Sequence, residues 1–169
     1  MHLIIDAYNL LGVLKSTGNH SEVDRESLLQ RLAAYRLRKG HALTVVFDGW
    51  RQGQISEHRE HRMGLQVIYS KRGEQADQVI QRLAREYRSD CAVVSSDHEI
   101  IATARAQGAL VLRAHEFAGR LDATQRFIGG AHKELDSGED EPQRRQDKKG
   151  NPRKLPKAVR RRSKQLRRF

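Results

Sequence analysis

The chain has 169 residues and a formal net charge of +11, a length that suits one domain of ordinary size and hardly two. Its single cysteine, Cys91, excludes an internal disulfide and fits a reducing compartment. No apolar stretch reaches the roughly 20 residues that span a bilayer, and the N-terminus lacks a basic segment followed by a long apolar one. We therefore expect a soluble, cytoplasmic protein with no membrane partner.

The positive charge is concentrated at the C-terminus. Residues 143–169 hold thirteen Lys or Arg and one acid, a net of +12, which leaves residues 1–142 with a net of −1. A dense block of cations binds polyanions through counterion release, whatever their sequence. Nucleic acid is the expected partner rather than an anionic membrane, because the tail lacks a wide apolar face. The expected RNA-binding cations of the tail are Arg160, Arg161 and Arg162.

Short apolar runs alternate with segments of helical periodicity along the first part of the chain. The apolar runs predict strands at residues 2–5, 42–47, 65–69, 91–94 and 110–112. Stripes of apolar residues predict helices between Ser21 and Gly40 and at residues 74–87, 98–107 and 116–127. Ser21 and Asp24 predict a capping box for the first helix, and Gly40 predicts its end.

Residues 49–64 are expected to form a long polar loop, and a loop of that length in a compact domain is often functional. Strands that alternate with helices predict an α/β fold with a parallel sheet covered on both faces. Apolar residues nearly vanish after Gly129 and Gly130, so we expect a domain at residues 1–128 and a charged linker with a basic tail at 129–169. The tail cannot bury a core and is expected to be mobile in isolation.

Four acids lie where strand-like runs end or a helix begins. Asp6 follows LII, Asp48 follows LTVVF, Asp97 follows AVVSS, and Asp77 lies in the first turn of a predicted helix. Parallel strands end at one common edge of a sheet, where ligands bind. Carboxylates gathered there would repel each other unless a cation lay between them, and Mg²⁺ or Mn²⁺ takes oxygen ligands. The pattern predicts a metal-dependent enzyme that acts on phosphates.

Each acid also has a simpler interpretation. Asp6 and Asp97 could cap helices, Asp48 belongs to a turn-forming Asp-Gly pair, and Asp77 is favoured by the helix dipole. Asn9 could orient a water or a phosphate, or cap the following turn. A functional role is favoured, because four independent helix caps explain poorly why the acids lie at four corresponding positions. A direct role is expected least for Asp48.

Cations close to these acids in the sequence suggest how a nucleic acid is held. Arg51, Arg59 and Arg62 lie in the predicted loop and would hold a substrate backbone beside the acids. A charge-rich loop can equally be a solvated surface. Trp50 or Tyr8 could stack on a base of a single strand, or Trp50 could anchor the loop on the core. Lys71 and Arg72 complete the expected RNA-binding set.

The segments IIDAYNLLG, VVFDG, GEQADQVI and VVSSD, in this order and spacing, resemble the NYN branch of the PIN-like nucleases, and most closely its bacterial YacP-like group. The match covers about residues 1 to 125. The resemblance implies a PIN-like three-layer α/β/α sandwich with a central parallel sheet, and endoribonuclease activity that depends on Mg²⁺ or Mn²⁺. The residues implied for the metal are Asp6, Asp77 and Asp97 with Asp48 and Glu74, and Asn9 is the polar residue of the first motif.

The mechanism implied by the resemblance is hydrolysis of a phosphodiester. Cations held by Asp6, Asp77 and Asp97 would polarise a phosphate oxygen and lower the pKa of a bound water for in-line attack. RNA is the expected partner, and the family's association with translation makes the ribosome or mRNA a candidate target. A non-catalytic RNA- or ribosome-binding module on the same fold stays open, as do single-stranded DNA as a substrate and the oligomeric state.

Overall fold

The computed structural model describes residues 1–15, 21–49 and 55–130. The chain divides into two units, Met1–Phe127 and Ile128–Phe169, of which the first contains the sheet. Within the described ranges, no helix is both long enough and apolar enough to cross a bilayer. The expected RNA-binding residues Arg51, Arg160, Arg161 and Arg162, and the aromatic Trp50, lie outside the described residues.

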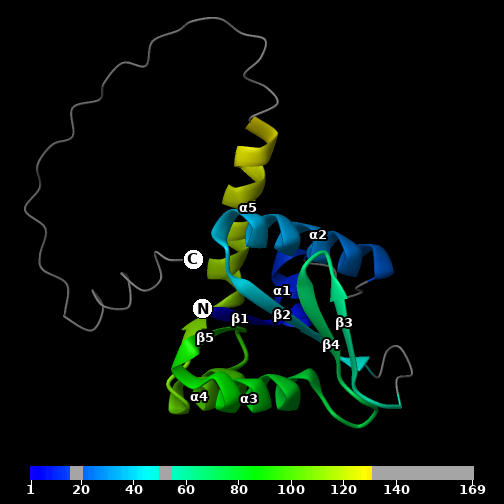
Figure 1. The fold of residues 1–169 in the computed structure, drawn as a ribbon, viewed down its shortest axis with the longest axis vertical. Helices are drawn as coiled ribbons and strands as arrows, with labels where there is room; N and C mark the ends of the chain where they lie inside the picture. Colours follow the sequence, from blue (N-terminus) through cyan, green and yellow to red (C-terminus); the bar gives the residue numbers. More distant parts are fainter. Residues whose placement is uncertain (16–20, 50–54, 131–169) are drawn as a thin grey trace, which may run out of the picture. The chain divides into compact units, whose positions relative to one another are not determined.

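Six described strands form one sheet in the order β3-β4-β2-β1-β5-β6 (Figure 1). All neighbours pair in parallel except β3 and β4, which are antiparallel. The expected α/β fold is therefore confirmed, with a mostly parallel sheet. The strands are β1 (His2–Asp6), β2 (Ala42–Phe47), β3 (His58–Arg62), β4 (Leu65–Tyr69), β5 (Cys91–Val94) and β6 (Leu110–Leu112).

The predicted loop over residues 49–64 is wrong from His58 to Arg62, which form β3 at the edge of the sheet. β3 joins β4 through Met63 and Gly64, whose positive φ values of 53° and 77° are those of a tight hairpin turn. The sequence HREHR shows no apolar alternation because an edge strand needs backbone bonds to one neighbour only, and charged side chains protect such an edge.

The helices agree with most of the predicted ones and add a short helix after β1. Helix α2 begins with the predicted capping box, since Ser21 and Asp24 exchange hydrogen bonds, and it ends at Gly40 with a φ of +70°. Helix α3 starts two residues later than expected, so Glu74 precedes it. The helices are α1 (Ala7–Leu14), α2 (Glu22–Lys39), α3 (Ala76–Tyr87), α4 (His98–Ala106) and α5 (Ala114–Gly130), with a 3-10 turn, η2 (Arg88–Asp90), after α3.

Helices α3 and α4 lie on one side of the sheet, and α1 and α2 lie on the other (Figure 1). Ile4, Val46, Ile68 and Val93 belong to the core cluster that includes the buried residues of α3 and α4. Side chains alternate between the faces of a sheet, so the residues two positions further along point toward the same helices. These residues, at the carboxyl edge of four neighbouring strands, are Asp6, Asp48, Ser70 and Ser95.

Candidate active site

Asp6 is the last residue of β1 and is buried, with 7% of its surface exposed. Its Oδ1 accepts a hydrogen bond of 3.1 Å from the backbone N–H of Asn9 and so caps α1, while its Oδ2 accepts one of 3.1 Å from the hydroxyl of Ser95. Burial, together with the weaker effect of the charges of Asp77 and Asp48, raises the pKa of Asp6 to about 6 against the effect of these two donors.

Asp48 connects the end of β2 to the start of α3. Its Oδ1 accepts a hydrogen bond of 2.6 Å from the backbone N–H of Ala76, the first residue of that helix. The next residue, Gly49, donates its N–H to the hydroxyl of Ser70 at 3.0 Å. A Cβ at Gly49 would lie 1.7 Å from the carbonyl oxygen of Ser70, so only glycine fits there. The Asp-Gly pair thus makes a tight contact with Ser70, the residue that follows β4, while it brings a carboxylate to the edge.

Asp77, the second residue of α3, is half-buried above the same edge. Burial raises its pKa, and the negative charges of Asp97, Asp48 and Glu99 raise it further. Since Asp77 also raises the pKa of Asp6, acids from β1, β2, α3 and the start of α4 act on one another electrostatically.

The Ser95-Ser96-Asp97 segment that follows β5 links the other elements of the site. Ser95 Oγ accepts a hydrogen bond of 3.1 Å from the N–H of Asp97 and donates to Asp6. Ser96 donates its N–H to Oδ1 of Asn9 at 2.9 Å. Sequence reasoning did not assign Ser70 or Ser95, although each is the first polar residue after an apolar strand and so carried a usable signal.

The capping interpretation is correct in part, because Asp97 Oδ1 accepts from the N–H groups of Glu99 and Ile100 at 2.8 and 3.1 Å. Capping and function do not compete here, since each cap uses only some of the carboxylate lone pairs. Within the described ranges, Oδ2 of Asp48 and Oδ2 of Asp97 accept no hydrogen bond. These oxygens stay available to a ligand.

The donor set fits a hard divalent cation. It consists of carboxylate oxygens, and the pKa values of Asp6 and Asp77 are raised first by burial and then by the charges of neighbouring acids. Among the described residues, no three His, Cys, Asp or Glu side chains are close enough together to hold a metal ion by themselves. Mg²⁺ is usually bound by one or two carboxylates, with water and substrate phosphates as its other ligands.

Glu74, which the resemblance placed among the metal acids, forms an ion pair with a cation of α3. Its Oε1 accepts from Arg82 Nη1 at 2.9 Å, and Arg82 also pairs with Glu57 just before β3. The second oxygen of Glu74 is buried without a hydrogen-bond partner in the described part of the chain. Glu74 therefore anchors Arg82 beside the start of β3.

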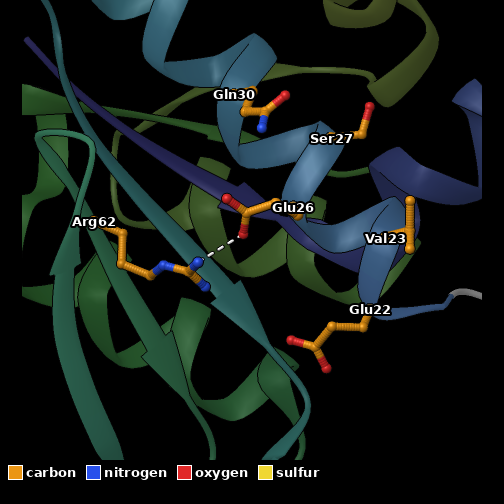
Figure 2. Close-up of a pocket in the computed structure, with 6 residues that line it drawn as sticks. All are labelled: Glu22, Val23, Glu26, Ser27, Gln30 and Arg62. Carbon is orange, nitrogen blue, oxygen red and sulfur yellow. Dashed lines mark hydrogen bonds and ion pairs between the residues drawn. The ribbon is translucent and has the colours of Figure 1, made fainter.

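The predicted RNA-binding residues fall into two groups. Arg59 pairs with Glu57 at 2.7 Å, and Arg62 pairs with Glu26 of α2 at 2.6 Å, so acids offset both charges. Lys71 and Arg72 are exposed and form no ion pair with another described residue. Figure 2 shows the ion pair of Arg62 and Glu26. Both residues line a groove of about 460 Å³ between β3 and α2, together with Glu22, Val23, Ser27 and Gln30.

A mostly parallel sheet between two helical layers, with acids gathered at its carboxyl edge, is the fold of the PIN-like nucleases. The sequence model of the YacP-like NYN domain matches residues 3–168, and the chain belongs to this family. The family is nuclease-like, which makes a hydrolase the class of protein at the coarse level.

Relatives from Bacillus subtilis agree with this assignment. The chain is 31% identical over 134 residues to the uncharacterized protein YacP of strain 168, a match that covers 75% of this chain and 78% of that protein. The crystal structure of Rae1 (YacP) from Bacillus subtilis superposes with a TM-score of 0.65 at 26% identity and covers 80% of this chain and 81% of that one. The crystal structure of a mutant of Rae1 gives a TM-score of 0.65 at 28% identity, with 79% of this chain and 82% of that one covered.

Proposed function

We propose that this protein is an endoribonuclease that hydrolyses RNA phosphodiester bonds with the help of Mg²⁺ or Mn²⁺, in the cytoplasm and on mRNA or ribosome-associated RNA. The observation that carries the proposal is the position of Asp6, Asp48 and Asp97 at the carboxyl ends of the neighbouring strands β1, β2 and β5, beside Asp77 in the first turn of α3, where these acids raise the pKa values of Asp6 and Asp77. Repulsion between clustered acids lowers the stability of the fold. A bound cation removes this repulsion, and the free energy that is regained adds to the affinity for the cation.

One or two of the carboxylates of Asp6, Asp77 and Asp97 would hold the cation directly and the others through its bound water molecules, with Asp48 in support. A bound divalent cation supplies Lewis acidity and lowers the pKa of a water molecule. Asn9 would orient the substrate, because its Oδ1 is occupied by the N–H of Ser96 and its NH₂ group is left to donate to a phosphate oxygen. The hydrogen bonds from Ser95 and Asn9 keep the carboxylate of Asp6 in one orientation.

The basic tail supports an RNA partner through its composition. The net charge of +12 over residues 143–169 would add affinity for any polyanion. The acids of the edge would set the chemistry, and the tail would raise the local concentration of RNA.

The decisive experiment incubates the full-length protein with a mixed RNA pool in Mg²⁺, Mn²⁺ or EDTA, beside the Asp6→Asn variant. Internal cleavage that needs the metal and is lost in the variant is the expected result. Equal cleavage by wild type and Asp6→Asn would show that the activity comes from elsewhere. RNA that is retained by the protein but stays intact under every metal condition would instead identify a non-catalytic RNA-binding module.

A further inference from the structure

Cations lie on both sides of the acids along the carboxyl edge of the sheet. In strand order, β4 is followed by Lys71 and Arg72, β2 by Asp48, β1 ends in Asp6, and β6 is followed by Arg113. The edge therefore presents positive, negative and again positive charge in sequence across the sheet.

Arg113 is held in place by its backbone. Its N–H donates to Oε2 of Glu116 at 3.1 Å, and its carbonyl oxygen accepts from Phe117 at 3.1 Å, so it opens α5. The next N–H, of Ala114, donates to the hydroxyl of Ser96 at 3.2 Å, which fixes this turn beside the Ser95-Ser96-Asp97 segment. The Arg113 residue is exposed, and its guanidinium pairs with no acid of the described ranges.

Lys71 and Arg72 are fixed in a similar way on the other side. The N–H of Glu74 donates to the carbonyl of Lys71 at 3.0 Å across a tight turn, in which Gly73 has a φ of +83°. The preceding residue, Ser70, is bonded to Phe47 and Gly49 of the neighbouring chain segment. Both cations are therefore carried on a short, anchored turn next to Asp48.

The contrast with other arginines near the sheet is informative. Arg59, Arg62 and Arg82 each form an ion pair with a glutamate at 2.9 Å or less. Lys71, Arg72 and Arg113 keep their charges free of any described acid although carboxylates gather between them. An unpaired cation on a fixed backbone is suited to a phosphate, whereas a paired one would first have to break its ion pair.

From this arrangement we infer that Lys71 and Arg72 on one side and Arg113 on the other form a phosphate clamp, so that a single RNA strand crosses the strand ends at right angles to the strands. The inference rests on the proposed function, which puts the scissile phosphate above Asp6 and Asp77. Four strand spacings separate β4 from β6, about 19 Å in all. An extended strand of several nucleotides covers this distance and places phosphates on both sides of the scissile one.

Binding is best measured in full-length protein that carries Asp6→Asn, so that the RNA stays intact. The probe is a labelled single-stranded RNA oligonucleotide, and its affinity is titrated against salt. Each phosphate contact on a single strand contributes about 0.7 to the slope of log affinity against log salt. Arg113→Ala should lower this slope by about 0.7, which is about fivefold in affinity per tenfold change in salt, and Lys71→Ala with Arg72→Ala should lower it by about 1.4.

Arg105→Ala is the matched control, because Arg105 is an exposed arginine in the last turn of α4 and pairs with no described acid. Helix α4 begins after the carboxyl end of β5 and leads back to β6, so Arg105 lies toward the opposite edge of the sheet. Its loss should leave the slope unchanged. Equal effects of Arg105→Ala and Arg113→Ala would mean that only net charge matters, and the clamp would be rejected.

Trimming the RNA tests whether the strand crosses the site. When nucleotides are removed from one end, Arg113→Ala should no longer affect binding, while the Lys71 and Arg72 substitutions still should. When the other end is trimmed, only the effect of the Lys71 and Arg72 substitutions should disappear. Loss of both effects on trimming the same end would overturn the proposed path. If the wild type binds in this way but cleaves no RNA, the clamp stands and the nuclease assignment falls.

Discussion

The hydroxyl of Ser95 donates a hydrogen bond of 3.1 Å to Oδ2 of Asp6, which lies 89 positions earlier in the chain. The same hydroxyl accepts the N–H of Asp97 at 3.1 Å, so one buried serine sets the distance between two acids of the site. This contact exists because β1 and β5 are parallel neighbours that end at the same level.

Ser95→Ala should raise the pKa of Asp6 above about 6, because the hydrogen bond from Ser95 is one of the factors that lower it. The acidic limb of the pH profile of RNA cleavage should shift to higher pH. Ser70→Ala is the matched control, since Ser70 is also buried at a strand end but bonds to Gly49 rather than to Asp6. A profile that moves equally in both variants would show a general loss of structure instead.

Asp6→Asn should stabilise the protein at neutral pH while it removes activity. The pKa of Asp6 is raised from 3.8 to about 6, so the folded protein binds more protons than the unfolded one between these values. Stability from this group is therefore present at low pH and is lost as the pH rises to about 6. Asparagine avoids the buried charge, and the gain at pH 7 should reach up to about 3 kcal/mol.

Urea unfolding of wild type and Asp6→Asn in EDTA, at pH 7 and at pH 3.5, measures this effect. The difference in the free energy of unfolding should shrink toward zero at the lower pH, where the wild-type carboxyl is protonated in the folded state and largely so in the unfolded one. An Asp6→Asn variant that is less stable than wild type at pH 7 would contradict the sign of the shift.

Replacement of Asp97 separates its capping role from its proposed role in the site. Asparagine caps helices as well as aspartate does, whereas alanine costs about 1 kcal/mol. Asp97→Asn should be as stable as wild type. Asp97→Ala should be less stable by that amount, because only alanine abolishes the hydrogen bonds from the N–H groups of Glu99 and Ile100. RNA cleavage should fall in both.

Thermal unfolding with and without Mn²⁺ supplies a readout that is independent of activity. Binding of a cation to the folded state raises the melting temperature of wild type, and a variant that lacks a ligand shows a smaller rise. If Asp97→Asn kept both the full Mn²⁺-induced rise and full cleavage, Asp97 would be a cap and nothing more.

Gly49→Ala should destabilise the protein by roughly 1 to 3 kcal/mol or more and impair cleavage, because the new methyl group meets the carbonyl of Ser70 at 1.7 Å. The ends of β2 and β4 would have to separate, which moves Asp48. Gly12→Ala is the control, because it should stabilise the protein. Outside its chain neighbours and its own helix backbone, a Cβ at Gly12 of α1 would meet no described atom within 4 Å, and alanine favours a helix there by up to about 1 kcal/mol. Calorimetric melting temperatures of the two variants should move in opposite directions.

Local patterns in the amino-acid sequence were enough to predict the layered α/β fold and the elements that meet at one edge. Strands buried on both faces are near-continuous apolar runs, and the residues that follow them, such as Asp6 and Asp48, emerge together because parallel strands share a direction. The capping box at Ser21 and the end of α2 at Gly40 were also predictable, because they depend only on local hydrogen bonds and backbone conformation.

The pairing of side chains, in contrast, became visible only in the folded chain. The ion pair of Arg62 with Glu26 and the bond of Ser95 to Asp6 join residues 36 and 89 positions apart, and no local pattern encodes such distances. The edge strand β3 was not predicted either. Its backbone hydrogen-bonds to the strand β4, and its own sequence has no apolar periodicity that would indicate a strand. Local chemistry sets where the chain turns, and packing across strands sets which charges remain unpaired.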